Sequence, residues 1–285
     1  MRALFLTRRT ARLLFLTAIA VLLSNPFPGI AAALAPSLGS ASGFAILAGT
    51  AVTCTNGTVT GDVGVWPGNA ITRTRCTVTG TVHAADGVAK QAYLDFITAY
   101  NTLRDNPPAC DATLTGTLSG QVLLPGVYCV DAVAKTGVLI LDANGRADAS
   151  WIFLVDGALT GKNFNVVMIN GGDPCNVLWW VRDAATLTDS NFIGTILAGA
   201  AMTVTRGTFH GNALATAAVT VTGAAMTACE AGGPGPGPDP VKRKCNQGVG
   251  NGPEGCDPGN SNHHHPSNDE RGGTPGNPGR KPGNR

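Results

Sequence analysis

Short stretches of the chain alternate apolar side chains with threonine, which is typical of β-strands. Six segments share one order, in which a small residue and an apolar residue precede a threonine. Residues i and i+2 lie on the same face of a strand, so the apolar residues should point inward and the threonines outward. The six segments are residues 51–55, 70–74, 158–162, 184–188, 201–205 and 218–222.

The last three segments repeat at a constant interval, because Thr186, Thr203 and Thr220 follow one another every 17 residues. Such self-similarity is typical of a solenoid, in which each coil adds strands to a stack. The outward threonines should then form two columns. The first is Thr53, Thr72, Thr160, Thr186, Thr203 and Thr220, and the second is Thr55, Thr74, Thr188, Thr205 and Thr222, with Lys162 in place of one threonine. Arg73 and Gly161 fit the inward positions less well.

One segment, residues 84–104, has helical periodicity instead. Its apolar residues recur at spacings of three and four, which predicts a helix with one apolar stripe. The stripe is formed by Val88, Ala92, Phe96, Ala99 and Leu103. Two prolines at positions 107 and 108 should end the helix. We expect the stripe to pack against the side of the strands.

The two ends of the chain differ from this middle part. Residues 1–33 combine arginines, an apolar run and a final Ala31–Ala33, which predicts a signal peptide cleaved near Ala33, with an uncleaved anchor as the alternative. The apolar run, residues 13–23, is too short to cross a bilayer as a helix. After a body at residues 34–230, residues 231–240 form a Gly/Pro linker, and residues 241–285 should be a disordered tail.

Composition narrows the classes of function. Charged residues make up 13% of the chain and the net charge is +2, which gives no electrostatic reason to expect nucleic acid or acidic membranes as partners. The eight cysteines of an exported chain favour disulfides, and the absence of a CxxC motif argues against zinc ribbons and thioredoxin chemistry. The simplest pairing is 54–76, 110–129, 175–229 and 245–256, although the sequence leaves other pairings open.

Candidate chemistry is sparse. A parallel solenoid can be a polysaccharide lyase or hydrolase, but these enzymes need paired carboxylates, and no close pair recurs on the outward positions. Asp111, Asp142 and Asp148 fall in expected turns, where aspartate caps backbone groups. We therefore expect no catalytic residues and no cofactor. We expect a structural role for His83 and no specific metal site at residues 263–265 of the tail, while the lone His210, near an expected turn between coils, indicates no particular role. Of the adjacent Trp179 and Trp180, one should point inward and the other outward, where a ring more often covers apolar surface beneath a loop or the helix than forms a platform for stacking sugars.

Several sequence blocks resemble the ice-binding-like family of bacterial and microalgal proteins, in family order across nearly the whole body. They are residues 38–41, 44–49, 61–65, 80–86, 124–128, 151–153, 175–179 and 192–198. The resemblance implies an all-β fold, namely a right-handed, three-sided β-solenoid with one long α-helix packed alongside. It also implies that the coils need not stack in sequence order. Family members that bind ice often carry a T-A/G-x-T/N pattern, which residues Thr50 to Thr53 match.

The resemblance and the threonine columns together predict a secreted, monomeric ice-binding protein. Stacked strands lie about 4.7–4.9 Å apart, so two columns would form a flat and stiff grid of methyl and hydroxyl groups. The candidate contact residues are Thr50 and the threonines of both columns. The alternative is an extracellular adhesion or matrix module without ice activity, attached to a cell surface or matrix through the tail. Charges on the face, such as Lys162 and nearby Asp183, would favour that alternative.

Overall fold

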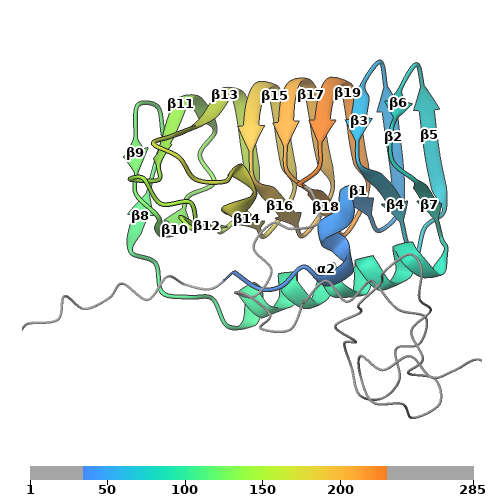
Figure 1. The fold of residues 1–285 in the computed structure, drawn as a ribbon, viewed down its shortest axis with the longest axis horizontal. Coiled ribbons are helices and arrows are strands. Elements are labelled where there is room, and N and C mark those ends of the chain that lie inside the picture. The colour runs from blue at the N-terminus through green and yellow to red at the C-terminus, as the bar shows by residue number, and fades with distance from the viewer. Residues whose placement is uncertain (1–34, 230–285) are drawn as a thin grey trace, which may run out of the picture.

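A computed structural model of the chain describes residues 35–229 (Figure 1). The predictions for residues 1–33, for the linker at 231–240 and for the tail at 241–285, including a 245–256 disulfide, lie outside the described residues. None of the helices between residues 35 and 229 combines the length and the hydropathy that a membrane-spanning helix needs.

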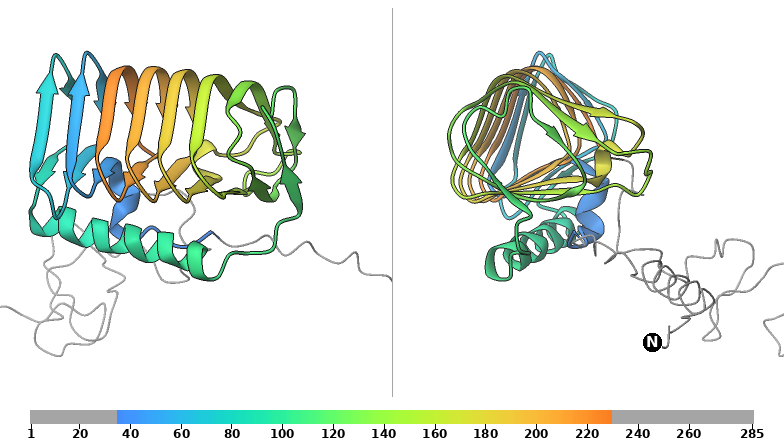
Figure 2. Two further views of the ribbon diagram at one scale, coloured as in Figure 1. Left: turned by 180° about the vertical axis from the view of Figure 1, so that it is seen from behind. Right: turned by 90° about the vertical axis from the view of Figure 1, so that its left-hand side faces the viewer.

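The chain winds into a stack of coils whose strands pair in parallel, and the stack has a triangular cross-section (Figure 2). Side A of the triangle is a nine-stranded sheet. In spatial order it contains β7 (Val82–Ala84), β4 (Asp62–Val65), β1 (Phe44–Ala48), β18 (Ala213–Ala215), β16 (Thr195–Ala198), β14 (Val177–Val181), β12 (Trp151–Val155), β10 (Gly126–Val130) and β8 (Ala112–Leu114).

The second sheet bends and so forms the other two sides. Its strands are, in spatial order, β5 (Ala70–Thr74), β2 (Ala51–Thr55), β19 (Val219–Thr227), β17 (Met202–His210), β15 (Ala185–Ile193), β13 (Leu159–Ile169), β11 (Lys135–Asp142) and β9 (Val122–Leu123), while β3 (Thr58–Thr60) pairs with β19 and β6 (Thr77–Val78) pairs with β3. We call side B the surface formed by β5, β2 and the first halves of β19, β17, β15 and β13. Side C is formed by β6, β3, the second halves of those four strands, and most of β11 with β9.

The corner between sides B and C is built from residues with left-handed backbone conformation. Each of the strands β13, β15, β17 and β19 has one residue at its middle with φ between 49° and 63°, and in β17 Gly207 follows it with φ 91°. These residues are Asn163 in β13, Asp189 in β15, Arg206 in β17 and Gly223 in β19, and Asn56 and Arg75 take the same role after β2 and β5. Asparagine, aspartate and glycine tolerate this conformation better than other residues, so the sequence marks most of these corners.

The coils do not stack in sequence order. Strand β2 pairs with β19, and β1 pairs with β18, so the first coils lie beside the last. Asn212 helps to hold this junction, because its side-chain amide donates to the carbonyls of Ser42 and Phe44 at 2.8 and 2.7 Å. Helix α2 (Gly87–Asp105) then runs along side A and returns the chain to the opposite end of the stack (Figure 1). The expected all-β solenoid with one long helix alongside is thereby confirmed.

Helix α2 begins three residues later than the sequence predicted, because residues 82–84 form β7. Its N-cap is Asp86, whose carboxylate accepts from the Ala89 amide at 2.8 Å. Four of the five predicted stripe residues are buried against side A, but Val88 is 52% exposed, and the prediction for it was wrong. Val88 lies in the first turn, where Ala89 faces the sheet instead.

Aromatic rings fill much of the interior between the three sides. Trp179 stacks on Phe153 with ring centroids 3.8 Å apart, and Phe192 stacks on Phe209 at 5.5 Å. The adjacent Trp180 points the other way, beneath α2, and its indole N–H donates to the Tyr100 carbonyl at 3.1 Å. The two tryptophans therefore lie as the strand alternation predicted.

Three disulfides brace the described residues, and they confirm three of the four predicted pairings. Cys54 pairs with Cys76, Cys110 with Cys129, and Cys175 with Cys229.

At the β8–β9 end of the stack, the buried ammonium of Lys135 donates to the Gly116 carbonyl at 2.9 Å and pairs with Asp131. Burial raises the pKa of Asp131, but hydrogen bonds from Lys135 and Gly116 outweigh it and leave that pKa below its usual value.

Candidate functional site

The threonines of the first predicted column are aligned across six neighbouring strands of side B. Thr160 pairs with Thr186, Thr186 with Thr203, and Thr203 with Thr220. The column then continues from β19 to the first coils, where Thr220 pairs with Thr53 and Thr53 with Thr72. Segments that are far apart in the sequence therefore contribute to one unbroken row.

The second column runs parallel to the first, two residues further along each strand. Its order is Lys162, Thr188, Thr205, Thr222, Thr55 and Thr74. Lys162 interrupts it at one end, as the sequence indicated. All eleven threonines of the two columns are exposed or half-exposed. Thr50 is exposed as well, but it lies in the bend before β2 and outside both columns.

The side chains beneath the columns explain why the threonines point outward. Strand β17 alternates buried Met202 and Val204 with the partly exposed Thr203 and Thr205, and β15 and β19 repeat the pattern. Gly161 takes an inward position in β13, where a Cβ atom would come within 2.9 Å of a methyl group of Leu187. Arg73 is exposed because β5 is the outermost strand of side B, which the sequence pattern could not show.

The hydroxyl groups of the two columns are free to bind water. Among residues 35–229, none of these threonine side chains forms a hydrogen bond with another protein group. Threonine has few χ1 rotamers on a strand, so the methyl and hydroxyl positions are restricted before anything binds. The result is a regular array of weakly polar groups on a rigid support.

Charges lie at the edges of this array. Arg206 and Asp189, which occupy the bend between sides B and C, form an ion pair whose second contact, from Arg206 Nη2 to Asp189 Oδ2, measures 2.7 Å. The hydrogen bond from Arg206 lowers the pKa of Asp189, and the positive charges of Arg206 and Lys162 add to the effect. Asp183 is exposed before β15, at the opposite corner of side B. In the middle of the array, the side B parts of β17, β19 and β2 carry no charged side chain on their outward positions, and Arg206 follows only at the bend of β17.

Sequence reasoning missed the second outward surface, side C. On it, Asn191 donates to the Asn165 side-chain carbonyl at 3.0 Å, and Thr208 donates to the Asn191 side-chain carbonyl at 2.8 Å. Farther along, the surface carries exposed Val167 and Ile169. Asparagine, aspartate or glycine after the second threonine signals the bend, and the alternation that resumes beyond it could have revealed this surface.

The remaining candidate residues have structural contacts. His83 Nδ1 lies 2.7 Å from a carboxylate oxygen of Asp86, at the start of α2. Asp111 accepts from the Val127 amide and Asp142 from the Asn144 amide, both at 2.8 Å, so these aspartates cap backbone groups as predicted. His210 lies near the Cys175–Cys229 disulfide.

Comparisons with known proteins agree with this architecture. The family model described as ice-binding-like matches residues 46–227. An ice-binding protein of Nostoc sp. (strain HG1) is 38% identical over 171 residues, which cover 58% of this chain and 63% of that protein. Ice-binding protein 1 of Shewanella frigidimarina (strain NCIMB 400) is 30% identical over 201 residues, covering 58% of this chain and 22% of that protein. The chain thus spans less than two thirds of these curated relatives.

The matches to solved structures cover nearly the whole of those chains. The crystal structure of an ice-binding protein from the Antarctic ascomycete Antarctomyces psychrotrophicus has a TM-score of 0.65 and 32% identity, covering 68% of this chain and 98% of that chain. An ice-binding protein from an Arctic yeast, described by its antifreeze activity, has a TM-score of 0.61 and 26% identity, covering 70% of this chain and 97% of that chain.

Proposed function

The chain belongs to the ice-binding-like family, and we propose that it is a secreted protein that adsorbs to ice through the threonine columns of side B. The observation that carries the proposal is the register of these columns, which places threonine beside threonine on neighbouring strands from β15 through β17, β19 and β2 to β5. Thr160 extends the first column onto β13.

The spacing of the array suits an ordered layer of water. Neighbouring strands of a sheet lie about 4.7–4.9 Å apart, and residues i and i+2 of one strand about 6.6 Å apart. Hydroxyl groups on such a grid can hold water in regular positions, while the methyl groups limit other arrangements. Because the threonines are already ordered by the sheet, little entropy remains to be lost when ice is contacted. Many weak contacts made at once would then hold the protein on a growing crystal surface.

The three disulfides of the described residues support the secretion part of the proposal, because disulfides persist in oxidising compartments. The predicted signal peptide at residues 1–33 points the same way. We further propose that the protein acts as a monomer, since one copy presents the whole array.

The test is a measurement of thermal hysteresis and ice-crystal shape with the purified protein and two double variants. Thr203→Glu with Thr220→Glu places two charges side by side in the middle of the first column. Thr60→Glu with Thr227→Glu is the matched control, because these two exposed threonines are paired in the same way on side C. We expect faceted crystals from the unmodified protein and the control, and unshaped discs from the side B variant.

Each outcome has a definite meaning if the variants unfold at the same temperature as the unmodified protein. Loss of shaping in both double variants would contradict the assignment to side B. Discs that grow freely with the unmodified protein would contradict ice binding itself and favour the extracellular adhesion alternative, in which the solenoid acts as a spacer or a protein-binding surface.

A further inference from the structure

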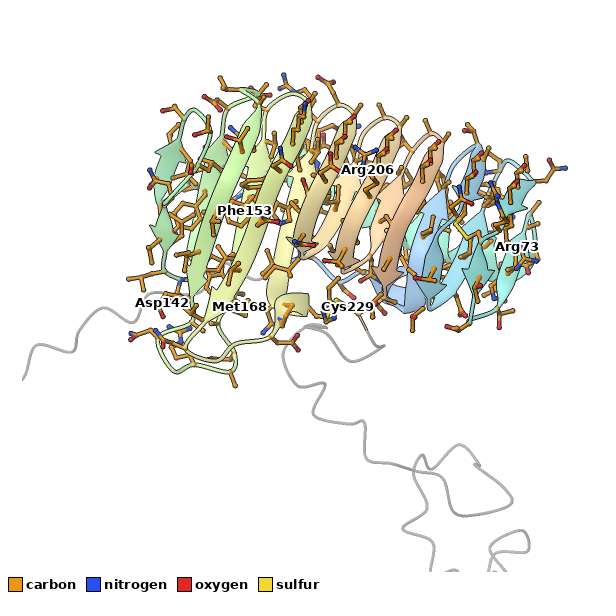
Figure 3. The ribbon with its side chains drawn as sticks, turned by 90° about the horizontal axis from the view of Figure 1, so that it is seen from above. Arg73, Asp142, Phe153, Met168, Arg206 and Cys229 are labelled. Carbon is orange, nitrogen blue, oxygen red and sulfur yellow. A yellow bond between two sulfur atoms is a disulfide. The ribbon has the colours of Figure 1, made fainter. Side chains whose placement is uncertain are left out.

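Three metal-ligating side chains meet at the corner between sides C and A, outside the threonine array. Cys175 lies in the short 3-10 helix η2 (Pro174–Asn176), His210 ends β17, and Cys229 follows β19. One ligand atom from each lies within 4.8 Å of the other two, and the two sulfurs are joined in a disulfide. Figure 3 shows Cys229 beside η2, at this corner of the stack.

The backbone fixes the positions of all three residues. His210 pairs with Thr227 in the register of β17 and β19, and the next amide, that of Gly211, donates to the Thr227 carbonyl at 2.8 Å. Cys229 follows two residues later. On the other side, the Asp173 carboxylate accepts from the Cys175 amide at 2.8 Å and orders the start of η2. The convergence therefore does not depend on the disulfide alone.

The imidazole of His210 is available as a ligand. It is exposed, and it forms no hydrogen bond or ion pair with any other side chain among residues 35–229. Cys229 is 5% exposed and Cys175 is half-buried, so thiolates at these positions would be partly shielded from water. Two thiolates and one imidazole are a ligand set that zinc prefers.

We propose that Cys175, Cys229 and His210 form a zinc site when the disulfide between the two cysteines is absent. Every newly made chain passes through this dithiol state before its disulfides form. Zinc–sulfur and zinc–nitrogen bonds of about 2.3 and 2.0–2.1 Å require tetrahedral ligand atoms about 3.4–3.8 Å apart, which the present separations allow after small side-chain rotations. A water molecule would fill the fourth position.

A thiol reductant supplies two electrons and two protons, which cleave the S–S bond and leave two thiols while the reductant becomes a disulfide. Zinc then displaces both thiol protons and binds the two thiolates and the neutral imidazole. A disulfide oxidant reverses the process: it takes two electrons from the two thiolates and two protons from solvent to become two thiols, while the S–S bond forms again and the metal is released. Either zinc or the disulfide can thus link Cys175 to Cys229 at this corner, but not both at once. The site does not depend on the proposed ice-binding function.

The experiment compares the full-length reduced protein with two full-length variants, using cobalt as a spectroscopic substitute for zinc. His210→Ala removes the imidazole but keeps every cysteine, so thiols elsewhere and the histidines of the tail contribute equally to both samples. Cys175→Ser with Cys229→Ser removes both sulfurs. Cobalt absorption reports tetrahedral thiolate ligation, and thermal unfolding is measured with and without zinc. If the reduced chain is unfolded without metal, the zinc-dependent recovery of β-structure is measured by circular dichroism instead.

Zinc at about a hundred times its Kd should raise the Tm of the reduced protein by about 5 °C or more. His210→Ala should weaken cobalt binding by at least about tenfold, and the double serine variant should lose the zinc-dependent rise in Tm. The oxidised protein should show neither the cobalt absorption of thiolate ligation nor a rise in Tm with zinc. Equal cobalt binding by the reduced unmodified protein and His210→Ala would overturn the proposal, as would an equal rise in Tm for the double serine variant.

Discussion

Sides B and C share four long strands, β13, β15, β17 and β19, yet the outward residues of the two sides differ. On side B, the outward positions of β15, β17 and β19 are all threonine. On side C, beyond the bend, the corresponding positions are Asn191, Thr208 and Ala225 in one row and Ile193, His210 and Thr227 in the next. Figure 3 marks the bend at Arg206 and the far end of side C near Cys229.

The inward positions do not show this difference. Leu187, Val204 and Val221 are buried under side B, and Phe192, Phe209 and Met226 are buried under side C. The solenoid therefore needs apolar residues inside both faces, but side C shows that it accepts asparagine, isoleucine, histidine or alanine outside. Folding alone does not explain the uniform threonine of side B. This contrast supports a function for side B that requires a regular surface.

The largest expected effect lies in the shared interior. Phe209→Ala under side C should cost about 3–5 kcal/mol and Leu187→Ala under side B about 2–5 kcal/mol, because each leaves a cavity among close-packed side chains. At about 2–4 °C per kcal/mol for a body of this size, both variants should lower the Tm by several degrees or more. Differential scanning calorimetry measures the change.

The matched controls are the outward neighbours Thr203→Ala and Thr227→Ala, which should change stability by less than about 0.5 kcal/mol. If Thr203→Ala lowered the Tm as much as Leu187→Ala, the uniform threonine of side B would be a requirement of folding. The contrast between the two sides would then carry no information about function.

The same contrast shows what the sequence could reveal. The alternation in residues 201–205 identified the strand, its inward face and its threonines, because a period of two is a local property. The register that joins Thr220 to Thr53 depends on the return of the chain along α2, a long-range arrangement that only the family resemblance indicated. Side C was missed because each bend interrupts the alternation. The exposure of Val88 depends on where the helix starts, which periodicity locates poorly.

The second largest effect is expected from substitutions at the bend that separates sides B and C. Gly207 has φ 91°, and a Cβ atom there would lie 2.1 Å from the backbone oxygen of Ser190. Gly223, at the bend of β19, has φ 63°, and its nearest neighbour would be Arg206 Cγ at 3.5 Å. We expect Gly223→Ala to cost about 1–2 kcal/mol from the left-handed conformation alone.

Gly207→Ala should cost more than Gly223→Ala, because the backbone of β15 must also move. Urea unfolding of the two variants measures both costs. Equal midpoints for the two variants would show that the close approach of β17 to β15 at this corner does not constrain the stack.

A third and smaller effect is expected when the second threonine column of side B is completed. Lys162→Thr completes the second column, which a strongly hydrated ammonium now interrupts. We expect thermal hysteresis to increase by less than about twofold, because one position is added to many weak contacts. The control is His210→Thr, which adds a threonine in register with Thr227 on side C and should leave thermal hysteresis unchanged. An equal increase from both variants would mean that sides B and C contribute alike.

The smallest effect concerns the charges at the corner between the two sides. The hydrogen bond and charge of Arg206 lower the pKa of Asp189 in the folded protein. The unfolded chain therefore binds a proton at a higher pH than the folded protein does. The ion pair thus stabilises the protein above the unfolded pKa of about 3.9, and its contribution is lost as the pH falls through the folded pKa.

Asp189→Asn keeps the shape of the side chain and a residue that tolerates the left-handed backbone, but it removes this titration. We expect its Tm to lie slightly below that of the unmodified protein at neutral pH, and the difference to disappear in acid. Ice shaping by both proteins should stay constant between about pH 5 and pH 8, because threonine does not titrate and the carboxylate stays ionised there. Shaping that changed with pH in the unmodified protein but not in Asp189→Asn would show that this corner takes part in contact with ice, and would extend the functional surface beyond the threonine columns.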